Sequence, residues 1–391
     1  MVLIAEPVHF AEVHVQVNSA FIALYRQVYG RGLHVYAEEQ HIAAIRKRAD
    51  NLVGDVNFTG FAAYGSSRGR WYWPGKIWGE WRQIWKVAGM ARRQQPELLV
   101  WLCLFPTGHL FLQLLSRLWL RGQRQLIVLH GEMEYLAPTP RARRSERFLG
   151  AVLRLAFKLA GPHTRYLALG EGIPGRLKKA GIDIPVQGLN HPFLYDRPLC
   201  PGLQPAAPLR VCTFGTLKRS KNAHLFFELA ARFRQEIGQG LIRFQAIGKL
   251  FPDMADCPRD WVDCYSAGDF LPQEAYEQQI AGNDLALFFY GSGSYQFSAS
   301  GAVHEALQLQ VPVWSLRNDY FADLFRAFPV GGCSDTLDEL EMALRAVLAD
   351  GGPRAAALRQ YRDHLIMFFH ENSFLLQAER LKSVTGTPVN V

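Results

Sequence analysis

The sequence predicts an α/β protein built from two doubly wound parallel sheets. Three observations support this fold class. Short apolar runs, typical of buried strands, alternate with segments of helical periodicity in both halves of the chain. A proline-rich stretch at 197–208 separates the halves. A length of 391 residues suits two domains, each large enough to form its own core.

In the first half, expected as a domain over 1–196, strands and helices alternate regularly. The expected strands are 2–5, 33–37, 56–61, 98–104, 125–129, 166–169 and 184–188. The expected helices are 13–29, 39–48, 108–121, 145–159 and 172–180. The apolar stretch 98–120 is interrupted by Pro106 and Gly108, which favours a strand and a packed helix over a membrane span. Parallel strands of this kind bind ligands at their carboxyl ends.

The second half, expected as a domain over 209–368, repeats the pattern after the linker at 197–208. The expected strands are 209–214, 242–247, 262–266, 285–290 and 311–316. The expected helices are 222–233, 273–281, 302–310, 337–348 and 353–367. The C-terminal segment 369–391 carries a last expected helix at 374–382.

Composition narrows the class of protein and of partner. Hydrophobic residues make up 49% and charged residues 20%, which is typical of a globular chain. The net charge of +8 favours an anionic partner: a nucleotide diphosphate, an anionic lipid surface or a nucleic acid. The six cysteines show no paired spacing, and the first residues lead into Glu6 without a basic segment. We therefore expect reduced thiols, no signal peptide and a cytoplasmic protein.

The stretch from Asp284 to Leu316 gives the most information about a ligand-binding site. It contains an apolar strand, a loop of glycines and serines, a short helix and a second strand. Ser298 or Ser300 could cap the helix, whose first N–H groups, beginning at Gly301, would attract an anion such as a diphosphate. Glu305, one turn into the helix, could accept hydrogen bonds from ribose hydroxyls. The structural alternative is an ordinary βαβ unit with a solvated glutamate.

A second basic segment follows the first strand of the second half. Gly215 and Thr216 are followed by Lys218, Arg219 and Lys221. Cations placed after a glycine at a strand end would suit an anion such as a diphosphate. The alternative is a solvated basic turn in front of a helix.

These two segments resemble the donor site of GT-B glycosyltransferases of the family-four type. The family's glutamate followed by Ala, an apolar residue and Pro-Val at fixed spacing is matched by Glu305 and the residues after it. Its G-R-L-x-x-x-K-G segment is matched at Gly215, Leu217 and Lys221. The pattern is incomplete, since Phe297 stands where the family carries a second glutamate. Three further departures concern Thr216 in place of Arg, Asn222 in place of Gly, and Gln310 in place of Gly.

The resemblance implies a GT-B architecture of two Rossmann-like domains facing each other across a cleft, with the C-terminal segment crossing back to the first domain. It implies a nucleotide diphosphate-sugar donor, retention of anomeric configuration, no metal and no other cofactor. Taken with the features of the two segments, it gives these candidate donor-binding residues: Gly215, Thr216, Lys218, Lys221, Ser298, Ser300, Gly301 and Glu305. The sequence contains no D-x-D, H-E-x-x-H, P-loop or dinucleotide-binding glycine motif.

The candidate catalytic residue is a histidine. His130 ends an expected strand, with Glu132 and Glu134 close behind. Histidine is the usual general base near neutral pH, and a carboxylate tunes it. In family-four enzymes a histidine at such a strand end lies near the donor sugar, and an inverting mechanism would use His130 or Glu132 as the base. The alternative is a histidine bonded to the backbone. His9 and His14 are weaker candidates near the first strand.

The segment 68–93 combines tryptophans with basic residues around one acid, Glu80. From Ile77 on, apolar residues recur at helical spacing, and Glu80 and Gln83 fall off that stripe. Tryptophan favours lipid headgroups and cations attract anionic lipid, so this segment is a candidate membrane and acceptor surface. Its candidate residues are Trp71, Trp73, Trp78, Trp81, Trp85, Arg82 and Lys86. The alternative is that the tryptophans pack in the domain core.

The sequence therefore predicts a glycosyltransferase that acts on a lipid-linked or polysaccharide acceptor, in the cytoplasm or on the inner face of the cell membrane. Its expected partners are the nucleotide-sugar donor, the acceptor and an anionic membrane surface, without nucleic acid. Three alternatives stay open: a catalytically degenerate scaffold of the same fold, which Phe297 and Thr216 favour, a nucleotide-sugar epimerase, and a nucleic-acid binder, which only the net charge suggests.

Overall fold

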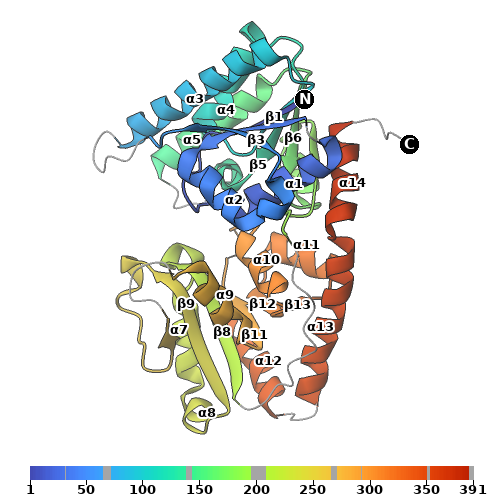
Figure 1. Cartoon of the computed structure of the whole chain (residues 1–391). Helices are drawn as coiled ribbons and strands as arrows, with labels where there is room; N and C mark the ends of the chain where they lie inside the picture. The colour runs from blue at the N-terminus through green and yellow to red at the C-terminus, as the bar shows by residue number, and fades with distance from the viewer. Residues whose placement is uncertain are drawn as a thin grey trace. The chain divides into compact units, whose positions relative to one another are not determined.

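The computed structural model describes residues 1–30, 32–64, 72–137, 143–194, 208–265, 271–291, 293–349 and 353–386. The chain divides into two compact units, which Figure 1 shows in cartoon form. Unit 1 comprises Met1–Leu194, Phe297–Ala299 and Asn372–Val391; unit 2 comprises Tyr195–Gln296 and Ser300–Glu371. The segment expected to link the halves lies outside the described residues, apart from Pro208.

Unit 1 is organised around a parallel sheet. Among the described residues it has seven strands in the order β3-β2-β1-β4-β5-β6-β7, all parallel to their neighbours. The strands are β1 (Val2–Glu6), β2 (Leu33–Glu38), β3 (Asn57–Phe61), β4 (Leu98–Trp101), β5 (Gln125–Leu129), β6 (Thr164–Ala168) and β7 (Val186–Gly188). The order reverses between β1 and β4, a switch point beside which α/β sheets bind ligands.

Helices cover both faces of this sheet. One face packs against α1 (Val15–Tyr29), α2 (Glu39–Val53) and α14 (Phe374–Thr385). The other packs against α3 (Tyr72–Gln94), α4 (Pro106–Leu118), α5 (Arg144–Lys158) and α6 (Ile173–Lys179). A short 3-10 helix, η1 (Gly131–Leu136), follows β5. Strands buried on both faces explain why the sequence reads as near-continuous apolar runs here.

Unit 2 repeats the plan with a second parallel sheet. Its described strands follow the order β10-β9-β8-β11-β12-β13, with the switch point between β8 and β11. They are β8 (Leu209–Leu217), β9 (Ile242–Leu250), β10 (Asp263–Cys264), β11 (Leu285–Phe288), β12 (Val313–Leu316) and β13 (Gly331–Ser334).

The unit 2 helices complete the layers. In chain order they are η2 (Arg219–Lys221), α7 (His224–Arg232), α8 (Arg234–Gly238), η3 (Pro252–Met254), α9 (Gln273–Ala281), α10 (Gly301–Gln308), α11 (Asp319–Ala327), α12 (Leu337–Ala349) and α13 (Pro353–Glu371). The apolar core includes side chains of α7 and α12 packed on β8, β9 and β11.

The boundaries expected from the sequence differ from the structure at many element ends, and unit 2 gives three examples. The helix expected at 222–233 begins only at His224, because Asn222 adopts a left-handed conformation with φ of 55°. The strand expected at 262–266 is reduced to Asp263–Cys264 in the described residues. Strand β13 was not predicted, because Gly331 and Gly332 are poor strand formers. The structure needs glycine at 331, since a Cβ there would lie 1.9 Å from the Val313 carbonyl oxygen.

Candidate functional site

Apart from Ser298, the residues predicted to hold a donor belong to unit 2, and they follow or end strands of its sheet. Gly215 lies near the carboxyl end of β8, the strand next to the switch point with β11. Its φ of +96° is open to glycine but strained for other residues. The paired Gly248 on β9 has a φ of +114°, and a Cβ there would lie 2.4 Å from the Gly215 carbonyl oxygen. This pair of glycines lets two strand ends approach closely at the place where a ligand would bind.

Lys221 is held beside this turn. Its Nζ donates to Thr216 Oγ1 at 3.0 Å and lies 5.7 Å from the centre of the Tyr290 ring. Burial, with the charge of Lys218, lowers the pKa of Lys221 to about 8, and Glu305 opposes that shift. Thr216, which replaces the arginine of the resembled motif, therefore orients the neighbouring cation.

Glu305 lies in α10 and has a described partner from α9. The Tyr276 hydroxyl donates to Glu305 Oε2 at 3.2 Å. Burial and the charge of Glu305 raise the pKa of Tyr276 well above its usual value, so the hydroxyl stays protonated. The structure thus brings Gly215, Lys221 and Glu305 into one neighbourhood, since a Cβ at Gly215 would lie 3.8 Å from the Tyr276 hydroxyl and Glu305 acts on the charge of Lys221. Tyr276 is a member of this group that the sequence analysis missed.

Arg219 and Lys218, the other basic residues of this segment, differ in whether their charge is already paired with an acidic residue. Arg219 donates to the Asp253 carbonyl at 2.8 Å and to Asp256 at 2.5 Å, so its charge is already engaged. Lys218 Nζ lies 6.0 Å from the Phe251 ring centre. Lys218 is therefore the better placed of the two to add positive charge beside Lys221.

The serines of the loop do not cap α10 as expected. Ser300 is the N-cap residue, but its side chain makes no capping hydrogen bond. Ser298 belongs to unit 1, where its hydroxyl donates to Glu134 Oε1 at 2.8 Å. The same oxygen accepts the Phe297 N–H at 3.0 Å. At Gly301, an added Cβ would meet open space, which leaves the first turn of α10 accessible.

Phe297 has a structural explanation. Its side chain is 2% exposed and packs in the apolar cluster of unit 1. Where the family carries a glutamate, this chain therefore has an apolar side chain that is buried in the core of unit 1. Glu134 of η1 holds the adjoining backbone, a role that the sequence did not reveal because 163 residues separate it from Phe297.

His130 lies at the carboxyl edge of the unit 1 sheet, directly after β5, and is buried. Burial lowers the pKa of His130, while Glu132 opposes the shift. Glu132 Oε1 accepts the His130 backbone N–H at 2.9 Å and lies 3.6 Å from His109 Nε2. Glu132 thus fixes the strand end rather than the His130 ring.

A second carboxylate–histidine group lies beside it, at the end of β1. Glu6 accepts the backbone N–H groups of Val8 and His9, at 2.9 and 3.0 Å, and the side-chain amide of Asn18 at 3.1 Å. His9 Nδ1 lies 3.2 Å from Glu6 Oε2. Burial alone would raise the pKa of Glu6, but the charge and hydrogen bond of His9, with His41 and the Val8 N–H, lower it to about 2.

The histidine rings of this edge form a cluster. His9 and His14 stack with centroids 3.9 Å apart, and the His130 ring lies 5.4 Å from His14 and 6.4 Å from His9. In the described residues no group of three or more His, Cys, Asp or Glu side chains is arranged to hold a metal ion.

The tryptophan-rich segment is helical over Tyr72–Gln94 in the described residues. Glu80 and Gln83, which fall off the apolar stripe of the sequence, are both buried. The Phe105 N–H donates to Glu80 Oε1 at 2.8 Å, and burial raises the pKa of Glu80 to about 8 despite that bond and Lys76. Gly108 of α4 makes room for this carboxylate, since a Cβ there would lie 2.1 Å from it.

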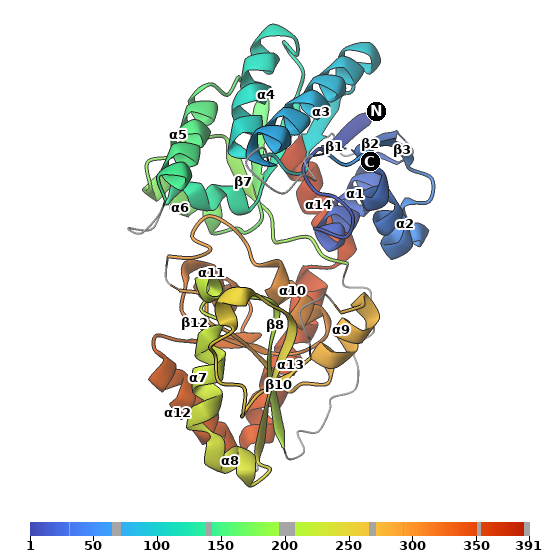
Figure 2. The same cartoon turned by 90° about the vertical axis from the view of Figure 1, so that its left-hand side faces the viewer.

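The tryptophans consequently lie on or near the surface of α3. Trp78 is 69% and Trp85 45% exposed; Trp73 is exposed, and Trp81 is half-buried. Trp71 lies outside the described residues. Figure 2 shows α3 beside α4, and the Trp85 ring lies 4.3 Å from that of Trp119, which follows α4. We call the exposed side chains of both helices the tryptophan surface: Trp73, Trp78, Trp85, Leu114, Leu118 and Trp119, with Arg82, Lys86 and Arg117.

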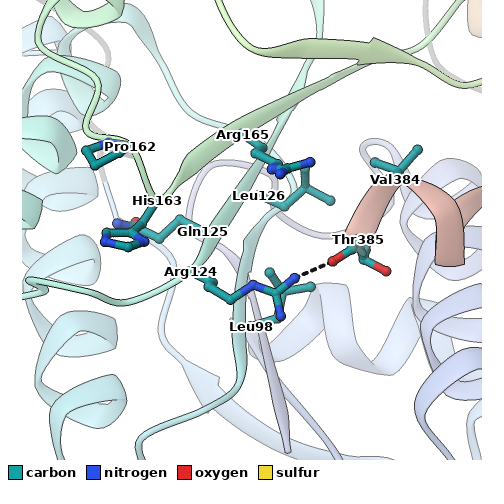
Figure 3. Close-up of a pocket in the computed structure, with 9 residues that line it drawn as sticks. All are labelled: Leu98, Arg124, Gln125, Leu126, Pro162, His163, Arg165, Val384 and Thr385. Atoms are coloured by element: carbon teal, nitrogen blue, oxygen red, sulfur yellow. Dashed lines mark hydrogen bonds between the residues drawn. The ribbon is translucent and has the colours of Figure 1, made fainter. Parts of the chain in front are cut away.

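A cavity of about 160 Å³ lies at the opposite, amino-terminal edge of the unit 1 sheet. Figure 3 shows the Arg124 and Arg165 side chains pointing toward the end of α14, where Arg124 donates to the Thr385 carbonyl oxygen. Arg117, at a neighbouring cavity, likewise donates to the Leu159 carbonyl at the end of α5. These arginines stabilise helix C-termini. None of the predicted site residues lies here.

Solved structures resemble the whole chain. No protein-family model and no curated protein matches the sequence. The Anabaena protein Alr3699/HepE, solved with UDP, superposes with a TM-score of 0.67 at 13% identity and covers 99% of this chain and 100% of its own. WaaG, a glycosyltransferase of lipopolysaccharide biosynthesis, gives 0.63 at 13% identity over 99% and 100%. Sucrose-phosphate synthase of Thermosynechococcus elongatus gives 0.67 at 11% over 98% of both chains.

These likenesses agree with the two parallel sheets and their switch points. In the part of the chain that the structure describes, no helix has the length and apolar character needed to cross a membrane. The chain has the GT-B fold of these glycosyltransferases.

Proposed function

We propose that the protein is a metal-independent glycosyltransferase that moves a sugar from a nucleotide diphosphate-sugar to a lipid-linked or polysaccharide acceptor. The observation that carries this proposal is the arrangement of Gly215, Lys221 and Glu305 around the switch point of the unit 2 sheet. A cation beside a glycine turn suits a diphosphate, and a carboxylate fixed by a tyrosine suits ribose hydroxyls. HepE has been solved with UDP and glucose, which supports a donor of this class.

In this proposal the first turn of α10, from Ser300 and Gly301, faces the diphosphate together with Lys218 and Lys221. His130 faces the reacting sugar, and Glu132 holds the strand end that presents it. The Ser298 hydroxyl is a positioning group, because it joins the loop to Glu134 within unit 1.

A thermal-shift screen of nucleotide diphosphates and nucleotide sugars tests the donor assignment. A ligand that binds only the folded state stabilises it, by about 2.7 kcal/mol at a hundred times its Kd. We expect one nucleotide diphosphate and its sugar conjugate to raise the melting temperature. If none does, the donor site is wrongly assigned. A degenerate scaffold, the alternative that Phe297 favours, would bind the nucleotide sugar without consuming it.

The tryptophan surface supports the acceptor assignment. Its indole rings are exposed, and the one acid of the segment, Glu80, is buried away from it, so the exposed face of α3 is purely basic. Each basic residue near an anionic surface contributes about 1 kcal/mol, and tryptophan favours the headgroup region. We propose that this surface docks unit 1 on the inner face of the cell membrane, where a lipid-linked acceptor would lie.

Sedimentation with vesicles containing anionic lipid measures this docking. We expect the protein to pellet with the vesicles at low salt and to be released as salt screens the cations. Trp78→Ser with Trp85→Ser should weaken binding at constant salt. Trp261→Ser, at a tryptophan of unit 2 that is 36% exposed, is the matched control and should bind like the wild type. Wild-type protein that stays in the supernatant at low salt would rule out the docking and favour a soluble acceptor.

A further inference from the structure

The Tyr276 hydroxyl lies between the two segments of unit 2 that were predicted to bind a donor. It donates to Glu305 Oε2 at 3.2 Å and so links α9 to α10. A Cβ added at Gly215 would lie 3.8 Å from the same hydroxyl, which therefore also borders the glycine turn of β8. All of these residues belong to unit 2, so the arrangement does not depend on unit 1.

The Tyr276 ring is held by the strand that carries the glycine turn. The Phe214 ring of β8 meets it edge to face, with centroids 6.1 Å apart and 80° between the ring planes. Phe214 is buried and packs in turn on Phe288 of β11, at 5.2 Å between centroids. Edge-to-face pairs favour a defined relative orientation of two rings. The strands on both sides of the switch point therefore fix the ring that carries the Tyr276 hydroxyl.

The direction of the hydrogen bond is also fixed. An ionised carboxylate can only accept hydrogen bonds, so the Tyr276 hydroxyl donates and the Glu305 oxygen accepts. Burial and the charge of Glu305 raise the pKa of Tyr276 well above its usual value, and the hydroxyl therefore keeps its proton. A carboxylate has two oxygens with several lone-pair sites, so one bond from Tyr276 leaves it able to accept further bonds from the hydroxyls of a ligand.

Holding the carboxylate in place has a consequence for binding. A glutamate that rotates freely must be ordered when it binds a sugar hydroxyl, and that ordering lowers the affinity. The bond from Tyr276 orders the Glu305 carboxylate before a ligand arrives, so less affinity is lost on binding. The benefit exists only for a ligand whose hydroxyls donate to Glu305.

We propose that Tyr276 is a positioning residue that holds the Glu305 carboxylate ready for the 2′ and 3′ hydroxyls of a ribose, and that the pair selects ribonucleotide over deoxyribonucleotide donors. The proposal rests on the glycosyltransferase function proposed above and narrows the donor to a ribonucleoside diphosphate-sugar. Glu305 is half-buried, so a sugar without these hydroxyls would shield the carboxylate from water without replacing the lost hydrogen bonds.

Isothermal titration of the full chain with UDP, 2′-deoxy-UDP and 2′,3′-dideoxy-UDP tests this selection. We expect the dideoxy nucleotide to bind the wild type about ten- to a hundredfold more weakly than UDP. The 2′-deoxy nucleotide, which keeps one of the two hydroxyls, should fall between them. If the thermal-shift screen favours ADP or GDP, the same comparison is made with that nucleotide and its two deoxy analogues.

The variant Tyr276→Phe separates positioning from structural support. Phenylalanine keeps the ring that packs on Phe214 and removes only the hydroxyl. We expect UDP to bind this variant about two- to tenfold more weakly and the dideoxy nucleotide to bind it as it binds the wild type, so the preference for ribose shrinks. Tyr265→Phe is the matched control in unit 2. It removes a hydroxyl that accepts from Gln245 Nε2 at 3.2 Å, and it should keep the wild-type affinity and preference.

Equal affinity of the wild type for UDP and its dideoxy analogue would overturn the proposal, and this result needs no variant. A Tyr276→Phe variant that binds UDP like the wild type would overturn it as well. So would one that loses the same factor for both nucleotides, because a residue that only supports the fold affects both alike. A wild type that binds no nucleoside diphosphate is a different outcome, since it removes the donor site and the function proposed above. Loss of the ribose preference alone leaves that site in place.

Discussion

Replacing Phe297 by glutamate, the residue that the resembled family carries there, is expected to destabilise unit 1 by at least about 3–5 kcal/mol. Loss of a buried phenyl ring accounts for a cost of that size. The new carboxylate would enter the apolar cluster in which Phe297 is 2% exposed, close to Glu134, so burial and a like charge both oppose its ionisation. Restoring the family residue should therefore harm the protein.

Urea unfolding at pH 8 and pH 5 measures this effect. The penalty should be smaller at pH 5, because a protonated carboxyl group costs less to bury. Phe148→Glu is the matched control: Phe148 lies on α5 of the same unit, is 63% exposed, and should change stability little. A Phe297→Glu variant that is as stable as the wild type and more active would show that the loop has the family's arrangement after all.

Removing the charge of Lys221 or the carboxylate of Glu305 is expected to weaken binding of a nucleotide diphosphate by about ten- to a hundredfold each. Loss of a charge-assisted hydrogen bond costs roughly 1.5–3 kcal/mol. Isothermal titration of Lys221→Ala and Glu305→Ala measures it. Glu274→Ala is the control, because Glu274 lies in the first turn of α9 and is exposed. If both site variants bind the nucleotide diphosphate with wild-type affinity, Lys221 and Glu305 do not belong to the donor site.

The pH dependence of that affinity has a definite sign. Lys221 has a lowered pKa of about 8, so its charge is present below pH 8 and is lost as the pH rises through that value. Nucleotide diphosphate affinity of the wild type should therefore fall between pH 7 and pH 9. In Lys221→Ala the same pH range should leave the affinity nearly constant.

The two-sheet fold was predictable because most of its strands are buried on both faces and are therefore apolar throughout. Such runs can be recognised from the local sequence alone, without knowledge of contacts between distant residues. The candidate donor residues could be proposed for a similar reason: Gly215 lies near the end of β8, Lys221 in the short helix after it, and Glu305 in the helix that follows β11. The carboxyl ends of parallel strands share one edge of the sheet. Tyr276 escaped notice because α9 approaches Glu305 only in the folded unit.

The orientation of α3 was not predictable from periodicity. Its tryptophans form the more hydrophobic stripe, yet the smaller side chains of Ile84, Val87 and Ala88 are buried. Glu80 joins them because the Phe105 N–H and the gap at Gly108 accommodate its carboxylate. Likewise, the sequence could show that Phe297 stands where the family has a glutamate. It could not show that the Phe297 side chain is buried in the core of unit 1.

The most direct test of the central claim is the release of nucleoside diphosphate from nucleotide sugars, measured for the wild type and for a Lys221→Ala, Glu305→Ala double variant. We expect the wild type to consume one nucleotide sugar slowly with water as the acceptor, and we expect the double variant, although folded, to consume none. A wild type that consumes none of them, or a double variant that matches it, would contradict the claim that unit 2 holds the donor of a sugar transfer.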